Sequence, residues 1–482
     1  MESLTKRILA IVLIAVIGVG IGLGAWFFLL TPGAGEYQWS ATDCPGAPTD
    51  IREDQIIKVG IIGDMARAVG QGQRNAGLMA AEEINTAGGV TIAGSADPYY
   101  IGIVWEDSDE NNPVLDTATA VSAAKRLINY RKPHFATGSS RTEAALAYQS
   151  LFLEKKMIFI NTGAATTTLT QKVLDDYNNS KYYFQISPTN TTALAYNLIT
   201  LVVSTAAFYT LLSGHNITRF SIMRDALSWT EGFRDALVYN LQNNPNFNLT
   251  YTGADIAFPQ TVTPTQMAAH WNTIVANNTQ LVIPIIASDA GLIFAESYGD
   301  LPGLGQTCIP IGINVLGQEA GFWTETAGRC NYSVGIDTVF ETNKTSKTLP
   351  FWNAYKAEYA TDPVYTASGT YDTIYQLKWM LEATDSFDSD VNVIQLETLT
   401  KSSGGLEGTG GFSAYDASHS PVYGYPFGVG LAVQWMNGAK KFLYAPGLYP
   451  SDPFSTIAGA PPYGTMLNQS LMVLPPNFHF YD

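Results

Sequence analysis

Small hydroxyl-bearing residues stand where apolar runs of the chain end, and these are the residues best suited to hold a ligand. Two such loops, 138–140 and 162–166, contain Ser139, Ser140, Ala164, Ala165 and Thr166. Arg141 is the only basic residue beside them. Hydroxyls and backbone N–H groups donate hydrogen bonds that suit a small anion. The pattern therefore favours binding of a small polar ligand.

Motifs that would indicate catalysis are missing from the sequence. There is no zinc-ligand cluster, His-Glu-x-x-His pair, Walker loop or Gly-x-Ser-x-Gly elbow, and the five histidines are scattered. The formal net charge of −16 argues against nucleic acid, which needs a basic surface. We therefore expect a protein that is not an enzyme and that uses no metal and no cofactor.

The elements that must position these loops are strands alternating with helices. Continuous apolar runs cover residues 58–64, 101–105 and 157–161, and helical patterns separate them. Such runs indicate a parallel sheet covered by helices on both faces. Ligands of such sheets bind beyond the carboxyl ends of the strands, where both loops lie.

A second series of strand–helix units follows a helix predicted over 192–213. Its strands are predicted at 219–224, 251–258, 281–286, 309–313 and 334–340. Trp229, Asp289 and Asn314 come after three of these strands, so they are expected at the edge of a second sheet. The chain of 482 residues is long enough for two such cores.

An ordered set of segments resembles the first lobe of type I periplasmic binding proteins. The segments are residues 57–60, 80–85 before Gly88-Gly89, 138–140 and 164–166. The resemblance is to the leucine/isoleucine/valine-binding group, which serves ABC importers. It implies an α/β fold of two doubly wound parallel-sheet lobes joined by three crossovers. The implied parts are 56–188 and 342–409 for lobe 1, 189–341 and 410–446 for lobe 2, and 447–482 as an extension.

The resemblance also implies a ligand site between the lobes. Ser139 and Ser140 match the family's carboxylate-binding serines, and Ala164, Ala165 and Thr166 match a second contacting loop. The alternative is that these small residues only let two loops pack. Trp229 matches an aromatic that covers the ligand side chain, although a tryptophan near a helix start is also typical of a core.

One position departs from the family. The acid that pairs with a ligand ammonium falls near Asn314, and an amide cannot neutralise a buried charge. Either Asp289 or Asp372 serves instead, or the ligand has no free α-amino group. Asp289 also suits a helix N-cap. The acidic cluster Asp107, Asp109 and Glu110 lacks the pattern of a calcium loop, and we expect a solvated strand end there.

The N-terminus predicts a membrane anchor. Lys6-Arg7 precede an uncharged apolar run over 8–30, which is long enough to cross a bilayer. A cleaved signal is the alternative for residues 1–30. The positive-inside rule leaves the rest of the chain outside the cell. Residues 31–55, which include Cys44, are rich in Pro, Gly, Thr and Asp and are expected to form a linker.

Two further features fit an external chain. Glycosylation sequons begin at Asn178, Asn190, Asn216, Asn248, Asn277, Asn331, Asn343 and Asn468. Cys308 and Cys330 bracket a short segment and are predicted to form a disulfide, with two buried thiols as the alternative.

These observations lead to one expected function and two alternatives. The expected function is capture of a small solute outside the cell and its delivery to an ABC permease. A sensory ectodomain of the same fold and a glycosylated surface protein with a vestigial cleft are the alternatives.

Overall fold

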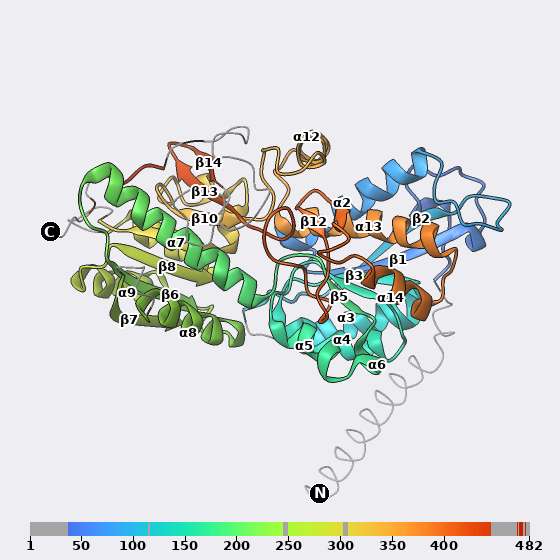
Figure 1. The fold of residues 1–482 in the computed structure, drawn as a ribbon, viewed down its shortest axis with the longest axis horizontal. Helices are drawn as coiled ribbons and strands as arrows, with labels where there is room; N and C mark the ends of the chain where they lie inside the picture. Colours follow the sequence, from blue (N-terminus) through green and yellow to red (C-terminus); the bar gives the residue numbers. More distant parts are fainter. Residues whose placement is uncertain are drawn as a thin grey trace, which may run out of the picture.

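The computed structural model describes residues 37–113, 116–243, 249–301, 307–444, 470, 472–475 and 478. They form two α/β lobes that lie side by side (Figure 1). Each lobe has a central sheet. Counted along the chain, the second strand of each lobe lies at the edge of its sheet, and the first strand lies next to it. Both sheets therefore have the doubly wound order, as expected.

The sheet of lobe 1 is wholly parallel, with the order β2-β1-β3-β4-β5. Its strands are β1 (Ile56–Gly63), β2 (Tyr100–Asp107), β3 (Phe135–Gly138), β4 (Phe159–Asn161) and β5 (Tyr183–Gln185). Strand β1 is buried at seven of its eight positions, which explains its continuous apolar sequence.

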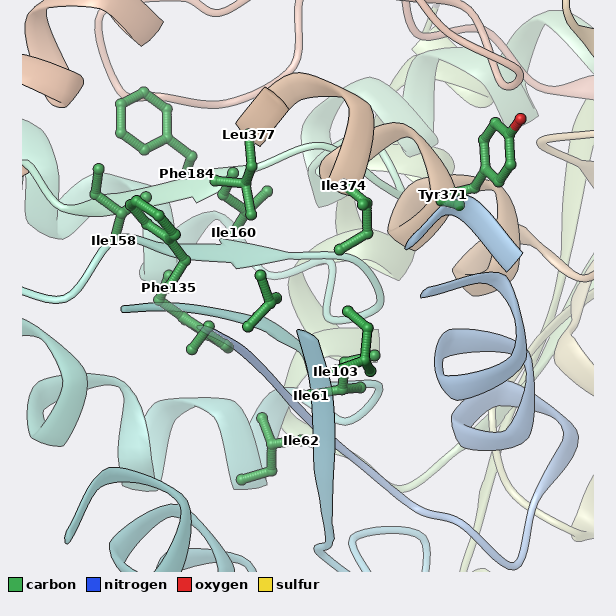
Figure 2. Close-up of a cluster of buried hydrophobic side chains, with 14 of the residues drawn as sticks. Ile61, Ile62, Ile103, Phe135, Ile158, Ile160, Phe184, Tyr371, Ile374 and Leu377 are labelled. Atoms are coloured by element: carbon green, nitrogen blue, oxygen red, sulfur yellow. The ribbon is translucent and has the colours of Figure 1, made fainter. Parts of the chain in front are cut away.

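Helices from two parts of the chain cover this sheet. The first part supplies α2 (Ala68–Thr86), α3 (Thr117–Arg126), the π-helical η3 (Leu127–Arg131), α4 (Thr142–Leu153), α5 (Thr167–Asp175) and α6 (Tyr177–Ser180). The later part of the chain, which returns to lobe 1, supplies α12 (Thr348–Tyr359), α13 (Tyr365–Thr384) and α14 (Ser389–Glu397). Helix α14 was not predicted from the sequence. Leu377 of α13 lies beside Ile160 of β4 in the shared core (Figure 2).

The sheet of lobe 2 has the order β14-β13-β10-β9-β8-β6-β7. Its parallel strands are β6 (Arg219–Asp225), β7 (Thr250–Phe258), β8 (Leu281–Ile286), β9 (Ile309–Asn314) and β10 (Val334–Asp337). An antiparallel pair, β13 (Leu431–Met436) and β14 (Ala439–Tyr444), completes the edge. Asn437 and Gly438 both have positive φ between them, as the tight hairpin turn requires.

The helices of lobe 2 include one that is long and predominantly apolar. They are α7 (Thr191–Ser213), α8 (Ser228–Asn243), α9 (Pro264–Ala276), α10 (Ala290–Gly299), the 3₁₀ turn η4 (Val315–Gln318) and α11 (Phe322–Glu325). By length and composition α7 could cross a membrane, but 67% of its apolar window is buried within the protein. Figure 1 shows α7 lying along lobe 2, so it serves as a core helix.

Three segments connect the lobes, as expected. They are residues 186–190, residues 338–347, and the chain that follows the small hairpin of β11 (Leu406–Glu407) and β12 (Phe412–Ser413). The third crossing comes later than the expected boundary at 410. Tyr415 is still part of the lobe 1 core, where its ring meets Phe184 at 5.0 Å and its hydroxyl donates to Gln376.

Residues 37–55 differ from the expected linker because they pack onto lobe 1. Trp39 is 4% exposed, and its indole N–H donates to the Arg131 carbonyl at 2.6 Å. Cys44 is also buried in the lobe 1 core, between the 3₁₀ turns η1 (Ala41–Asp43) and η2 (Glu53–Gln55). The polar composition of this segment did not indicate that Trp39 and Cys44 would be buried. The predicted anchor at 1–30 lies outside the described residues.

The predicted disulfide between Cys308 and Cys330 is wrong for this structure. Both are free, buried thiols, as is Cys44. Cys308 packs in the cluster around Trp271 and Tyr298, whereas Cys330 packs with Phe322 and Trp435. Burial raises the pKa of the two thiols to about 12 and about 11. They act as small apolar core residues, which was the alternative.

The predicted sequons differ in their surroundings. Asn178, Asn216 and Asn343 are exposed, and Asn277 and Asn331 are half-buried. Asn190 caps α7 through its oxygen and donates from its amide nitrogen to Ser420 at 2.7 Å, so a glycan on that nitrogen would interfere with the contact to Ser420. Asn248 and Asn468 lie outside the described residues.

Candidate functional site

A cleft lies between the lobes, beyond the carboxyl ends of both sets of parallel strands. Lobe 1 contributes the loops after β3 and β4, and lobe 2 contributes the segments after β6, β8 and β9. The crossing segments close its back through Ser187, Thr338 and Gly428. This is the position at which doubly wound sheets hold ligands.

Four of the predicted site residues line this cleft. Ser140 and Ala165 come from lobe 1, and Trp229 and Asp289 come from lobe 2. Trp229 is half-buried and also touches the lobe 2 core, where its ring meets Phe233 at 5.9 Å. Both earlier interpretations of Trp229 are therefore compatible with its place.

The other four predicted residues stand behind or beside the cleft. Ser139 and Ala164 are buried under the loops. Thr166 caps α5 by accepting from Thr168 and faces a separate depression near α7 and α8. Asn314 donates to the Gly291 carbonyl at 2.9 Å. Sequence position alone could not tell which side of each loop faces the cleft.

A close approach of two loops explains the small residues. A Cβ on Gly163 would lie 2.0 Å from the Ser139 carbonyl oxygen, so only glycine fits between them. Gln73 of α2 donates to that carbonyl at 2.6 Å and to the Thr162 hydroxyl at 3.1 Å. The packing interpretation therefore applies to Ser139 and Gly163, while Ser140 and Ala165 remain on the cleft side.

The donors of Ser140 are already engaged by an internal carboxylate. Its backbone N–H and its hydroxyl donate to one oxygen of Glu110, at 2.8 and 2.9 Å. Glu110 is 2% exposed, which corrects the expected solvated strand end at this position, whereas Asp107 and Asp109 are exposed as expected. Burial raises the pKa of Glu110 to about 7, against the opposing effect of the Ser140 hydrogen bonds. No local sequence pattern indicated that this acid turns inward.

Arg141, which follows Ser140, is a cleft residue that the site prediction left out. Its side chain is 6% exposed. Nη1 lies 3.4 Å from the Glu110 carbonyl oxygen, and Nε lies 3.5 Å from the Glu143 carboxylate without hydrogen-bond geometry. Nη2 makes no hydrogen bond within the described residues. Its place directly after the paired serines was the available signal.

The acids around the cleft mostly have donors of their own. Asp289 pairs with Arg67 at 2.6 Å and makes no N-cap hydrogen bond. Asp372 accepts from the backbone N–H groups of Thr409 and Gly410, and burial raises its pKa to about 6. Neither of the two acids proposed for a ligand ammonium is therefore free of partners.

Two polar contacts join the lobes. The Arg67–Asp289 pair links the start of α2 in lobe 1 to the start of α10 in lobe 2. The Ser228 hydroxyl of α8 donates to Glu143 of α4 at 2.9 Å. The lobes therefore touch through two polar pairs, and the residues of one of them, Arg67 and Asp289, line the shared cavity.

Comparison with known proteins agrees with this architecture. The chain belongs to the periplasmic binding protein family, whose sequence profile matches residues 56–427. The predicted family is thereby confirmed. No curated protein sequence matches the chain.

Solved structures show the same fold at low sequence identity. A leucine-binding protein from Thermotoga maritima has 14% identity and a TM-score of 0.63, covering 81% of this chain and 98% of that chain. A branched-chain amino acid transporter substrate-binding protein from Streptococcus pneumoniae was solved with isoleucine. It has 17% sequence identity and a TM-score of 0.63, and the match covers 81% of this chain and 99% of that chain. A solute-binding protein from R. palustris was solved with benzoate. It has 13% sequence identity and a TM-score of 0.63, and the match covers 81% of this chain and 96% of that chain.

Proposed function

We propose that this protein is an extracellular solute-binding protein that captures a small polar ligand between its lobes and delivers it to an ABC permease. The observation that supports this most is the cleft, which is lined by both lobes. Two contacts, Arg67–Asp289 and Ser228–Glu143, join these lobes. Ligands of the structural relatives, isoleucine and benzoate, are of the size class that such a cleft admits.

The mechanism is selection of the closed state. The three crossing segments allow the lobes to part, and a ligand that contacts both lobes favours the state in which they meet. Binding involves no chemical step in this proposal. The permease would then recognise the closed pair of lobes.

The proposal places the described domain outside the membrane. Residues 8–30 would act as the anchor, with Lys6-Arg7 on the cytoplasmic side. The exposed asparagines Asn178, Asn216 and Asn343 are the sequons open to modification in such a setting.

Thermal unfolding of the full chain in detergent, with and without solutes, tests the function. The panel holds amino acids, aliphatic and aromatic carboxylates, their amides, amines and sugars. We expect one class to raise the Tm, since a ligand at a hundredfold excess over its Kd stabilises by about 2.7 kcal/mol. Ala165→Trp should abolish the shift by filling the cleft, whereas Ala276→Trp, on the exposed end of α9, should not. A flat response to every compound would refute the proposal.

A further inference from the structure

Arg141 is the strongest unused donor in the cleft. It is 6% exposed, and its Nη2 has no hydrogen-bond acceptor within the described part of the chain. A buried guanidinium N–H without an acceptor is costly, and a bound ligand would remove that cost. The planar fork of arginine matches a carboxylate with two parallel hydrogen bonds.

The serine loop cannot fill the same role in this structure. Glu110 accepts both the N–H and the hydroxyl hydrogen bonds of Ser140, so an internal carboxylate stands where a ligand carboxylate was expected. A second carboxylate at that point would meet Glu110 directly. A ligand anion would therefore have to be bound by the next residue in the chain, Arg141.

Negative groups near Arg141 are largely satisfied by other donors. Asp225 accepts from Ala287 N, Ser288 N and the Ser288 hydroxyl, at 2.7, 3.0 and 2.7 Å. Glu143 is engaged by the Ser228 hydroxyl through its other oxygen, and its Oε2 stays 3.5 Å from Arg141 Nε. Asp225 and Glu143 therefore leave Nη2 of Arg141 without an acceptor among the described residues, although the charge of Arg141 acts on Asp225.

The remaining lining is mainly apolar. Leu194, Leu227, Trp229, Ile313, Leu316 and Ile336 face the same cleft. Glu319 also lines it, near Arg67 and Asp289, and burial raises its pKa to about 7. A partly neutral Glu319 does not demand a cationic partner, so the lining does not require an ammonium on the ligand.

We propose that Arg141 is the anion-recognition residue of this cleft and that the solute is a small carboxylate with an apolar body. The inference rests on the proposed function and specifies its substrate class. An α-amino acid and a simple carboxylic acid share this chemistry, and the experiment separates them.

Calorimetric titration of the full chain with matched acids and primary amides tests the assignment. The pairs are 4-methylpentanoate and 4-methylpentanamide, benzoate and benzamide, and leucine and leucinamide. We expect at least one acid to bind about 100-fold more tightly than its amide, as a hydrogen-bonded charge pair allows. Tighter binding of leucine than of 4-methylpentanoate would identify an amino acid as the source of the carboxylate, and the reverse would identify a simple acid.

Variants assign the preference to one residue. Arg141→Gln should lower the affinity for the acid about 100-fold and abolish the preference over the amide. Arg141→Lys, which keeps the charge but loses the fork, should lower the affinity about tenfold and serves if the glutamine variant does not fold. Arg126→Gln is the matched control, because Arg126 is half-exposed and pairs with Glu106 away from the cleft.

The outcomes separate this inference from the function beneath it. Equal binding of acid and amide, binding of only uncharged or cationic solutes from the wider panel, or full acid affinity in folded Arg141 variants would overturn the role of Arg141 while leaving a solute-binding protein. Absence of binding by every compound would overturn the proposed function, and this inference with it.

Discussion

At the scale of single residues, Glu110 determines which donors the cleft offers to a ligand, because it accepts the hydrogen bonds of Ser140. It lies under the loop after β3, facing Ser140 and Tyr148, with Asp64 and Arg141 nearby. Desolvation favours the protonated acid, which is why its pKa rises to about 7. Because the folded state holds this proton more tightly than the unfolded state, the group's contribution to stability declines as pH rises from about 4.5 to about 7.

Glu110→Gln should therefore flatten the pH dependence of unfolding. The glutamine oxygen can still accept from Ser140, but it carries no titrating proton. We expect the stability of this variant relative to the wild type to be higher at pH 8 than at pH 5, measured by urea unfolding across that range. Glu154→Gln, at the exposed end of α4, is the control and should leave the profile unchanged. Parallel pH profiles for wild type and Glu110→Gln would show that Glu110 is not perturbed.

At the scale of elements, one lysine ties two crossing segments together. Lys344 is 2% exposed, and its Nζ donates to the carbonyls of Thr338, Gly410 and Val429. The Thr338 carbonyl lies on the same segment as Lys344, the Gly410 carbonyl lies in the turn of the β11–β12 hairpin, and the Val429 carbonyl lies on the third crossing. Burial lowers the pKa of Lys344 to about 7, with Asp372 as the opposing charge.

Lys344→Met should loosen this junction and destabilise the protein by about 3 kcal/mol at pH 7, since three buried carbonyls lose a donor. The folded state binds this proton less tightly than the unfolded state, so wild-type stability gains from this group between pH 7 and pH 10.5. The loss in the variant should thus be larger at pH 9 than at pH 7, measured by chemical denaturation. The exposed Lys401→Met is the control. A pH-independent difference would contradict the assigned shift.

The segment before β1 is a second element with a testable role. Trp39 →Ala should cost about 3–5 kcal/mol, the usual loss for a buried tryptophan. The expected fall in Tm would show that a soluble fragment must begin before Trp39, and not at Gln55 as the polar composition suggested. Gln38→Ala, beside it on the exposed side, is the comparison variant. An unchanged Tm in Trp39→Ala would mean that the segment does not contribute to the lobe 1 core.

At the scale of the whole molecule, the contacts between the lobes bear on the proposed balance between open and closed states. The Arg67–Asp289 pair is about two-fifths exposed on each side, so its worth is modest, on the order of 0–1 kcal/mol. In the proposed mechanism this pair favours the closed state over the open state. When the binding-competent state is less populated, the apparent affinity for the ligand falls in proportion.

Replacing both Arg67 and Asp289 with alanine should therefore enlarge the ligand-free molecule in small-angle X-ray scattering and weaken solute binding about two- to fivefold. The double replacement of Arg52 and Asp97, an exposed pair within lobe 1, is the matched control. An unchanged radius of gyration together with unchanged affinity would show that the pair does not hold the lobes.

The sequence by itself determined the alternation of strands and helices and the ends of the strands that face the cleft. Continuous apolar runs and alternating helices are local patterns, and they indicate parallel sheets covered by helices, with loops at the carboxyl ends of the strands. The two doubly wound lobes followed from the family resemblance and agree with the observed strand orders. The positions of Ser140, Ala165, Trp229 and Asp289 followed from that order.

Only the tertiary structure decided which polar groups remain available to a ligand. Ser140 loses its donors to Glu110, thirty positions earlier in the chain, and Asp289 finds Arg67 in the other lobe. Cys308 and Cys330 enter separate apolar clusters, although their spacing suggested a bridge. Hydrogen-bond partners and burial depend on residues distant in sequence, so local patterns cannot determine them.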